Sequence, residues 1–275
     1  MFEPNCVIVV VAPEISLKSN KVQKRIHSIL KKNIASYLEK ENISLGVISF
    51  GSGRLFVETN KTKEAIVSLK NCFGIHLLIE SQKEQTNSTE EIIEKGLEIS
   101  SGKIKESFAV RCKSFNNKIK SKQIEIELGS KILENNKKTK VNLGAPKTQL
   151  NIIVFDKKSF FYFDSVLGAE GMPVGSQGNV ALIGKNKNKL KQLAISLLKT
   201  GCRIKLIKSE NKIVLDLEKY NNSKELESIS VEDAREMLAN NRINGIFCDA
   251  LNLEEKKEFD SLIGEKTFAP LILLV

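Results

Sequence analysis

The sequence predicts a multidomain fold in which α+β segments precede a C-terminal α/β domain with a parallel sheet. The length of 275 residues allows two or three small domains, each with a core of its own. Positive charge is uneven, with 27 Lys and Arg against 17 Asp and Glu in residues 1–163, but 16 of each in residues 164–275. From residue 179 onward, apolar runs alternate with helical patterns, which is typical of parallel strands joined by helical crossovers.

Residues 1–61 are expected to form a compact domain with the order strand, helix, strand, strand. Its helix begins after a cap at Ser19 or Asn20, because apolar residues then recur at helical spacing as far as Leu38. The Gly-Ser-Gly turn at 51–53 predicts a hairpin. The expected first strand, loop and two hairpin strands are, in order, 5–12, 13–19, 43–50 and 54–58.

Residues 62–166 predict a second, mixed α+β domain that holds most of the excess positive charge. Within it, residues 103–158 carry 14 basic and 5 acidic side chains. The expected helices are 64–71, 90–98 and 121–133. The expected strands are 75–80, 107–115, a short one near Val141, and a hairpin of 150–155 with 159–163. A basic segment beside a neutral one indicates a polyanionic partner, although lysine-rich surfaces also serve solubility alone.

A glycine-containing linker at 167–178 leads into the third domain, residues 179–275, whose pattern predicts a mostly parallel sheet. The expected strands are 179–183, 202–207, 212–217, 243–249 and 270–275. The expected helices are 187–199, 231–241 and 253–262.

The loop between the first strand and first helix of this domain lies where α/β enzymes hold phosphate on a helix N-terminus. Such loops need several glycines for close backbone approach and usually a Ser or Thr near the helix. This loop instead reads Gly184, Lys185, Asn186, Lys187, Asn188 and Lys189. It either binds phosphate through backbone amides and lysines, or is a structural loop capped by one of its asparagines. The structural alternative is favoured.

Composition also limits the chemistry of the chain. The five cysteines are odd in number and show no CxxC pair, which argues against disulfides or zinc and favours a reducing cytoplasm. With His27 and His76 as the two histidines, no histidine-based metal centre is expected. Cys248 ends an expected strand, where a structural thiol is favoured over a nucleophile. No apolar run reaches membrane-spanning length, and the N-terminus lacks the basic start of a signal peptide. A cytoplasmic protein without a membrane partner is expected.

Three basic groups are the candidate RNA-binding residues, although each also fits a solvated surface. The cations of the first group fall on one arc of the predicted helix, opposite its apolar arc. The groups are Lys18, Lys21, Lys24 and Arg25; Arg111 and Lys113; and Lys118, Lys120 and Lys122. The chain has no Trp, and most of its 13 Phe lie in apolar runs. Recognition of a folded RNA by shape and backbone is therefore expected, rather than stacking on exposed bases.

Several segments resemble, in order, the tRNA 4-thiouridine synthetase (ThiI) family. The segment APEISLKSNKVQKRIHSIL at 12–30 is similar to the opening of that family, and GIH at 74–76 and FAVRCKS at 108–114 are similar to its THUMP domain. GAEGMPVGSQGNVALI at 168–183 resembles the linker into its PP-loop domain. The resemblance implies a ferredoxin-like N-terminal domain, a tRNA-binding THUMP domain and a Rossmann-like, PP-loop ATPase-like sheet.

The departures from the family point to lost catalysis. The family's Ser-Gly-Gly-x-Asp-Ser loop falls near 184–189, where this chain has none of those serines or aspartates and a single glycine. Asp249-Ala250-Leu251 stands where the family has a Gly-Glu pair, and the chain ends at Val275, before the region of the family's sulfur-handling cysteine. Binding of ATP and magnesium is therefore not expected, and the loop 184–187 is interpreted as degenerate.

These observations predict a non-catalytic tRNA-binding protein that presents the acceptor end of tRNA to a separate modification enzyme, or acts as a homodimer. Two alternatives stay open at this point. One is an active tRNA sulfurtransferase with an altered ATP site. The other is a scaffold whose C-terminal domain recruits a catalytic PP-loop partner.

Overall fold

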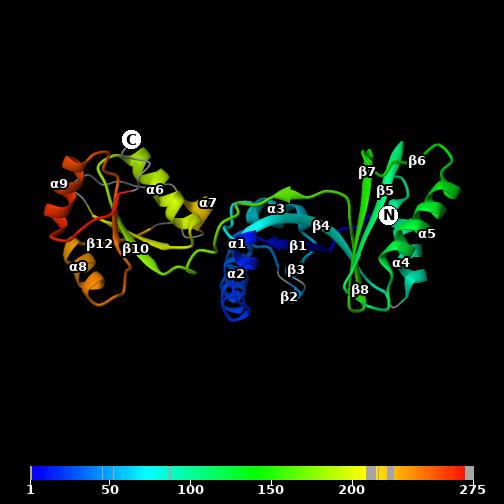
Figure 1. Ribbon diagram of the computed structural model, residues 1–275, viewed down its shortest axis with the longest axis horizontal. Helices are drawn as coiled ribbons and strands as arrows, with labels where there is room; N and C mark the ends of the chain where they lie inside the picture. Colours follow the sequence, from blue (N-terminus) through cyan, green and yellow to red (C-terminus); the bar gives the residue numbers. More distant parts are fainter. Residues whose placement is uncertain are drawn as a thin grey trace. The chain divides into compact units, whose positions relative to one another are not determined.

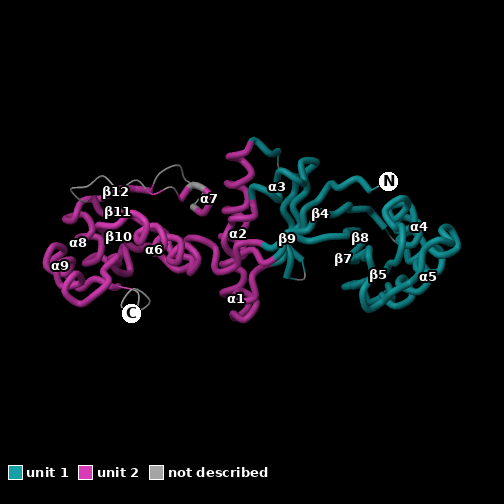
Figure 2. The backbone as a smooth tube through the Cα atoms, turned by 90° about the horizontal axis from the view of Figure 1, so that it is seen from above, with its two compact units in different colours: residues 1–10, 42–68, 77–167 teal, residues 11–41, 69–76, 168–275 magenta. Residues whose placement is uncertain are grey.

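The computed structural model describes residues 2–44, 46–51, 53–86, 88–208, 215, 217–221 and 226–269. The chain divides into two compact units (Figure 2). Unit 1 consists of residues 1–10, 42–68 and 77–167, and unit 2 consists of residues 11–41, 69–76 and 168–275. Each unit therefore combines segments that are distant in the sequence.

Figure 1 shows the helices and strands in chain order. The strands are β1 (Cys6–Val11), β2 (Ile48–Gly51), β3 (Arg54–Glu58), β4 (Ile75–Gln85), β5 (Ser107–Ser114), β6 (Lys140–Val141), β7 (Thr148–Phe155), β8 (Lys158–Tyr162), β9 (Val166–Leu167), β10 (Asn179–Ile183), β11 (Arg203–Ile207), β12 (Glu227–Ile229) and β13 (Ile246–Cys248). The helices are α1 (Pro13–Ser16), α2 (Asn20–Lys40), α3 (Thr62–Leu69), α4 (Thr89–Ser100), α5 (Ser121–Asn135), α6 (Lys187–Lys199), α7 (Glu218–Asn221), α8 (Val231–Ala239) and α9 (Leu253–Ile263).

Paired strands in the order β2-β3-β1-β4-β8-β7-β5-β6 organise unit 1, and β9 pairs with β4 at the side. β2 and β3 form an antiparallel hairpin, and β3 also pairs antiparallel with β1. β5 pairs parallel with β7, whereas β7 and β8 form a second antiparallel hairpin. Both hairpins expected from the sequence are therefore present.

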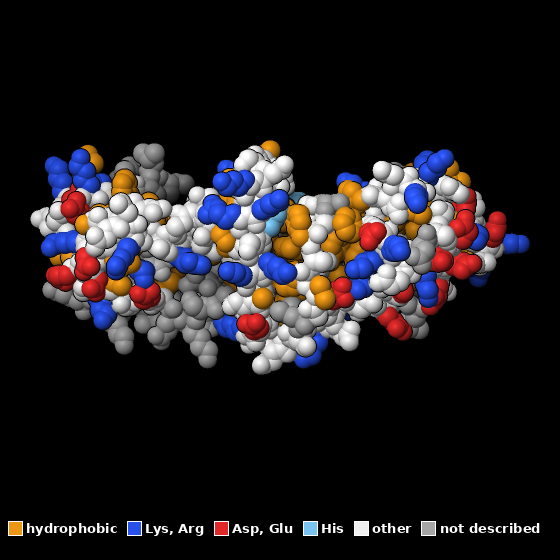
Figure 3. Space-filling model, turned by 90° about the horizontal axis from the view of Figure 1, so that it is seen from below, with side chains coloured by type: hydrophobic (Ala, Val, Ile, Leu, Met, Phe, Trp, Pro, Cys, Tyr) orange, Lys and Arg blue, Asp and Glu red, His pale blue; other side chains and the backbone are white. Residues whose placement is uncertain are grey.

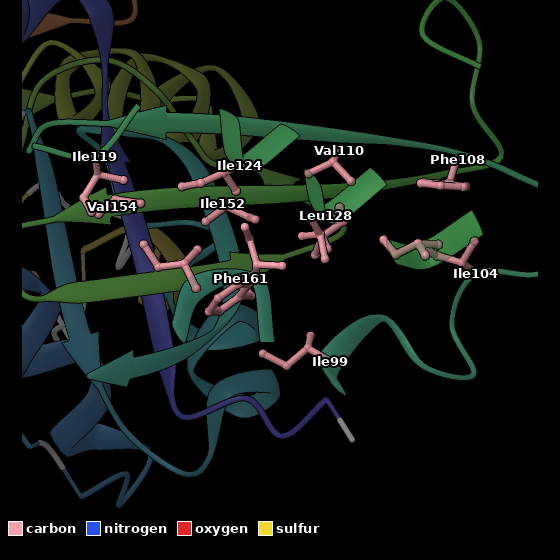
Figure 4. Close-up of a cluster of buried hydrophobic side chains, with 14 residues drawn as sticks. Ile99, Ile104, Phe108, Val110, Ile119, Ile124, Leu128, Ile152, Val154 and Phe161 are labelled. Carbon is pink, nitrogen blue, oxygen red and sulfur yellow. The ribbon is translucent and has the colours of Figure 1, made fainter. Parts of the chain in front are cut away.

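Helices α4 and α5 cover one face of β5, β7 and β8, and a hydrophobic core lies between these two layers (Figure 4). Figure 4 shows Ile124 and Leu128 of α5 directed toward the side chains of the strands. The strand residues of this core are Phe108, Val110, Leu150, Ile152, Val154 and Phe161, and its helix residues are Ile92, Ile93, Ile99, Ile124, Leu128 and Ile132. Each such side chain stabilises the fold by about 1.5–3 kcal/mol when it is removed from water.

The other face of these strands packs against the first hairpin through aromatic rings. Phe160 of β8 and Phe56 of β3 are stacked with centroids 4.4 Å apart, and Phe56 stacks with Phe155 of β7 at 6.0 Å. Gly51, at the end of β2, permits this contact. An ideal Cβ at Gly51 would lie 2.7 Å from Phe155 Cε1 and 2.9 Å from Cε2. The β2–β3 hairpin and β7 therefore meet where one strand residue has no side chain.

The C-terminal part of unit 2 is a parallel sheet in the order β12-β11-β10-β13. The inner strand β10 is buried on both faces, as expected for a parallel sheet covered by helices. Val180 and Leu182 of β10 pack with α6, whereas Ala181 and Ile183 pack with α8 and α9. The expected α/β architecture of this domain is confirmed.

The segment 168–178, expected as a linker, is anchored within unit 2 by hydrogen bonds. Arg25 Nη2 donates to Ser176 O at 3.2 Å, and Asn33 Nδ2 donates to Val174 O at 3.1 Å, so α2 holds one side of the segment. The backbone N–H groups of Met172 and Gly175 donate to carbonyls of the α6–β11 turn. This segment is therefore part of the folded unit.

Some expected elements differ from the structure. The loop expected at 13–19 contains the short helix α1, which begins with Pro13, a residue preorganised for the first helical position. The strand expected at 75–80 continues to Gln85, and that expected at 243–249 is confined to Ile246–Cys248. The short strands β9 and β12 were not predicted, because two or three residues show no periodicity. The strand expected at 270–275, and all but two residues of that at 212–217, lie outside the described residues.

Gly51→Ala is expected to lower the free energy of unfolding by about 1–3 kcal/mol, because the new Cβ overlaps the Phe155 ring. Gly129→Ala in α5 serves as the control, because it is expected to raise the free energy of unfolding. An ideal Cβ at Gly129 meets nothing within 4 Å, and Ala is a better helix former than Gly by about 0.5–1 kcal/mol. Urea unfolding of the whole chain, followed by circular dichroism, measures both variants. Equal stability of the two would contradict this packing account.

Candidate nucleic-acid interface

The loop between β10 and α6 folds around the carboxylate of Asp249. β10 and β13 are parallel neighbours with Ile183 opposite Cys248, so their carboxyl ends meet at one edge of the sheet. Asp249 follows β13 directly and is only 4% exposed. The Lys185 N–H lies 3.2 Å from both carboxylate oxygens, and the Asn186 N–H donates to Oδ2 at 2.8 Å. A buried negative charge therefore stands at the start of α6.

Gly184 permits the carboxylate to come this close. An ideal Cβ at Gly184 would lie 2.7 Å from Asp249 Cγ and 2.8 Å from Leu190 Cδ1. Any side chain at this position would push the carboxylate or the first turn of α6 away. The one glycine of the expected nucleotide loop is thus used for a contact inside the protein.

Asn186 is the N-cap of α6. Its Oδ1 accepts hydrogen bonds from the N–H groups of Asn188 at 3.0 Å and Lys189 at 3.1 Å. Between them, Asp249 and Asn186 accept bonds from four N–H groups at the start of this helix. In nucleotide-binding loops such N–H groups face phosphate oxygens. The capping role considered for this loop is therefore carried by Asn186.

Lys185 and Lys187 of the loop are exposed. Lys185 Nζ lies 2.5 Å from Glu258 Oε2 and 5.5 Å from the centroid of the Phe259 ring. The hydrogen bond to Glu258 raises the pKa of Lys185 above its usual value. Lys187, the first residue of α6, is exposed. The charge of Lys185 is consequently matched by a carboxylate of α9.

The first basic group lies on the surface of unit 2. Lys and Arg side chains gather over α1 and α2 in Figure 3. Lys18 precedes α2, while Lys21, Lys24 and Arg25 lie in its first turns, and all four are exposed. Arg25 also donates to Ser176 O, so it holds the 168–178 segment as well as facing solvent. The structure therefore brings the four expected cations together at one end of α2.

The second and third basic groups lie in unit 1, around the end of β5. Arg111 is partly buried and its Nη2 donates to Leu143 O at 2.6 Å, whereas Lys113 is exposed. Lys118 and Lys120 are exposed in the loop that leads to α5. Lys122, on the first turn of α5, lies 3.3 Å from Glu125 Oε2. Most of the positive charge expected here is therefore accessible, and two of the cations have partners within the unit.

Two residues near the second group were missed by the sequence reasoning. The Phe115 side chain is 37% exposed, and its ring has Arg54 Cζ at 5.5 Å and Lys113 Nζ at 5.2 Å from the centroid. Sequence pattern places Phe115 at the apolar end of a strand and Arg54 in a distant hairpin. The signal that could have pointed to Phe115 was the basic character of the sequence on both sides of it.

Three of the five thiols, those of Cys6, Cys72 and Cys248, are buried. Cys248 is fully buried, with Sγ 3.4 Å from Thr267 Oγ1. Burial raises the pKa of the Cys6 and Cys72 thiols to about 12, and burial lowers the pKa of His27. His76 Nδ1 lies 3.1 Å from Glu170 Oε1. Within the described parts of the chain, no three His, Cys, Asp or Glu side chains are grouped to hold a metal ion.

None of the helices in the described residues is both long enough and apolar enough to cross a membrane.

Comparison with family models locates two known domains. Residues 7–78 match the model of the ThiI ferredoxin-like domain, and residues 86–164 match the model of the THUMP domain. The chain carries a ThiI-type ferredoxin-like domain followed by a THUMP domain. The resemblance seen in the sequence is thereby confirmed for these two domains, and α2 and β5 with their basic groups lie inside them.

The chain spans less than two thirds of the length of the curated relatives it matches. A probable tRNA sulfurtransferase of Thermococcus kodakarensis is 27% identical over 250 residues, which is 84% of this chain and 65% of that relative. A probable tRNA sulfurtransferase of Methanosarcina mazei is 30% identical over 192 residues, which is 64% of this chain and 45% of the relative.

Two solved structures share the fold. PH1313 from Pyrococcus horikoshii superposes with a TM-score of 0.80 at 22% identity, covering 98% of this chain and 95% of that one. A 4-thiouridine synthetase in complex with RNA and ATP superposes with a TM-score of 0.60 at 21% identity, covering 89% and 61%. At these identities the likeness concerns the fold, and it extends over 98% and 89% of this chain.

Asp249→Ala is expected to lower the free energy of unfolding by about 2–4 kcal/mol, because the N–H groups of Lys185 and Asn186 lose a charged acceptor. Asp249→Asn keeps one acceptor oxygen and is expected to cost less. Glu265→Ala removes an exposed carboxylate from the same unit and serves as the control. Thermal or urea unfolding of the whole chain measures all three. Wild-type stability of Asp249→Ala would show that the carboxylate does not hold the loop.

Proposed function

We propose that this protein binds tRNA through its ferredoxin-like and THUMP domains and presents it to a separate modification enzyme, without adenylating or thiolating the tRNA itself. The observation that carries the non-catalytic part is the Asp249 carboxylate on the loop amides. In this proposal the C-terminal sheet is a structural frame that needs neither ATP nor magnesium.

The basic groups support the RNA-binding part of the proposal. Lys21 and Lys24 on α2, and Lys113 and Lys118 around β5, are exposed. Lysines of this kind contact phosphates as point charges and release condensed counterions from the nucleic acid. The relatives named above are tRNA sulfurtransferases by name, and one structure of the same fold holds RNA. A folded tRNA is therefore the polyanion that best fits these domains.

The loop before α6, whose N–H groups are bonded to Asp249 and Asn186, supports the absence of adenylation. A triphosphate at the start of α6 would have to displace the Asp249 carboxylate or lie beside it. Two unit charges of the same sign 4 Å apart repel each other by about 4 kcal/mol at an effective dielectric constant of 20. The N–H groups that normally offset such repulsion already have acceptors in this chain.

The names of the curated relatives favour a second candidate function, an active tRNA sulfurtransferase with an altered ATP site. Release of labelled pyrophosphate from ATP, measured with tRNA and with magnesium or manganese, separates the two candidates. We expect no release above the level without protein. Release that depends on tRNA would establish the enzyme and overturn the non-catalytic proposal.

For whole tRNA and for an acceptor-stem minihelix, the logarithm of the binding constant is expected to fall linearly as the logarithm of the salt concentration rises. The double variant Lys21→Gln/Lys24→Gln, and separately Arg111→Gln/Lys113→Gln, should each reduce the slope by up to about 2, since each phosphate contact contributes about 0.9. Filter binding over a NaCl series measures the slopes.

Lys199→Gln/Lys266→Gln is the matched control, because it removes two exposed charges from the C-terminal part of the chain. Its slope is expected to equal that of the wild type. An equal loss in all three double variants would indicate general attraction by net charge, and salt-independent binding would contradict the proposed interface.

A further inference from the structure

We infer that a cavity at the C-terminal ends of α4 and α5 binds an aliphatic polyamine, a flexible alkyl chain that carries two or more ammonium groups. The cavity lies within unit 1 and has a volume of about 460 Å³, in the range of small-molecule sites. It is lined by ten residues, two of which are glutamates and none of which is Lys, Arg or His. The inference goes beyond the proposed function and does not rest on it.

The two helices end at the same edge of the sheet, because each leads into one of two parallel strands. α4 ends at Ser100 and leads into β5, and α5 ends at Asn135 and leads through β6 into β7. β5 and β7 pair parallel, with Phe108 opposite Thr148. The last carbonyl groups of both helices therefore lie at one end of the domain. The negative ends of two helix dipoles favour a cation at that end.

Two carboxylates of α4 add formal negative charge to the cavity. Glu94 and Glu98 line it and lie about one helical turn apart, roughly 6 Å along the axis. Lys95 Nζ donates to Glu98 Oε2 at 2.9 Å, and this hydrogen bond lowers the pKa of Glu98. A carboxylate has two oxygens and accepts bonds from a second donor as well. An alkyl chain of about four methylene groups places two ammonium groups at a similar separation.

The cavity also has an apolar part. Ile104 and Ile132, each 4% exposed, and the half-buried Leu97 line it. Methylene groups pack against such side chains, as the stems of lysine and arginine do, while the ammonium groups reach the carboxylates and the helix ends. A metal ion gains nothing from an apolar wall, and the described residues include no group of three His, Cys, Asp or Glu that could hold one. The lining therefore fits an aliphatic cation.

Hydrogen bonds hold the walls of the cavity in place. The Asn136 N–H donates to Ile132 O at 3.0 Å, and Asn136 Nδ2 donates to Ile104 O at 3.2 Å. The end of α5 is thereby joined to the segment that follows α4. The Ser101 N–H donates to Leu97 O at 3.2 Å and closes the last turn of α4. Little ordering entropy is therefore lost by the protein when a ligand binds.

The negative character of this cavity is local. The whole chain has a formal net charge of +10, so it repels a polycation at long range. Binding of a polyamine to this chain therefore requires a site that offsets the repulsion, and general attraction by net charge cannot imitate it.

Titration calorimetry of the whole chain without RNA tests the ligand class. We expect 1,4-diaminobutane and spermidine to bind once per chain. Butylamine has the same carbon chain as the diamine but a single ammonium group, and it should bind roughly 10-fold more weakly, because one carboxylate then lacks its cation. Saturation-transfer NMR should show contact between the methylene protons of the diamine and the protein.

A pair of glutamine variants tests the carboxylates. Glu94→Gln/Glu98→Gln is expected to bind the diamine roughly 10-fold more weakly than wild type, since both charged acceptors are lost. Glu232→Gln/Glu236→Gln is the matched control, because these exposed glutamates lie at the same spacing on α8 and do not line the cavity. Its affinity should stay within about twofold of wild type. Circular dichroism confirms that both variants are folded.

A pair of lysine variants tests the cavity without removing a carboxylate. Asn135→Lys places a competing ammonium group at the rim, at the C-terminal end of α5, where a cation also suits the helix dipole. Ser130→Lys makes the same change of charge at another exposed position of α5 that does not line the cavity. We expect Asn135→Lys to lose affinity for the diamine and Ser130→Lys to keep it.

Each other result overturns the inference. Wild-type protein that binds neither polyamine has no such site. Equal losses in the two glutamine variants, or in the two lysine variants, would assign binding to net charge. Butylamine that binds as strongly as the diamine would remove the role of the paired carboxylates. Binding of a lysine-rich peptide without binding of the diamine would assign the cavity to a protein partner. Because these titrations contain no RNA, their outcome is independent of the proposed function.

Discussion

The buried carboxylate of Asp249 is the constraint on which the C-terminal domain depends. A charge removed from water must be matched by hydrogen-bond donors. The parallel pairing of β10 with β13 delivers this carboxylate next to the loop before α6, where unpaired N–H groups are available. The loop must then turn so that its N–H groups face inward, which requires Gly184. The same geometry that cradles a phosphate in other proteins is here completed by the chain itself.

This arrangement separates the stability of the domain from the binding of a nucleotide. A domain that needs a phosphate to satisfy its loop amides is less stable when empty, because ligand binding contributes to stability. Here the amides have acceptors in the protein, and the Asn186 cap secures the first turn of α6. The N–H groups of the loop before α6 therefore have acceptors from within the chain.

Much of the fold could be predicted from the sequence, because periodicity is a local property. The helix α6 spans 187–199, as its apolar spacing predicts, and the β7–β8 hairpin lies where its turn residues indicate. The decisive contacts could not be predicted, since they join segments far apart in the chain. Asp249 meets Lys185 only because β13 lies beside β10, and strand order is not written in either segment. Likewise, Arg54 meets Phe115 only because the β2–β3 hairpin packs against the end of β5.

The contact between Gly51 and Phe155 also constrains how this sequence can vary. With the present ring at 155, every side chain larger than hydrogen at position 51 collides with it. A smaller residue at 155 would leave a cavity beneath the hairpin while glycine is kept at 51. Positions 51 and 155 are therefore expected to change together among descendants of this chain. A protein that has changed at only one of the two positions is expected to be less stable. A loosening of this pair would also release Arg54 from the ring that it faces.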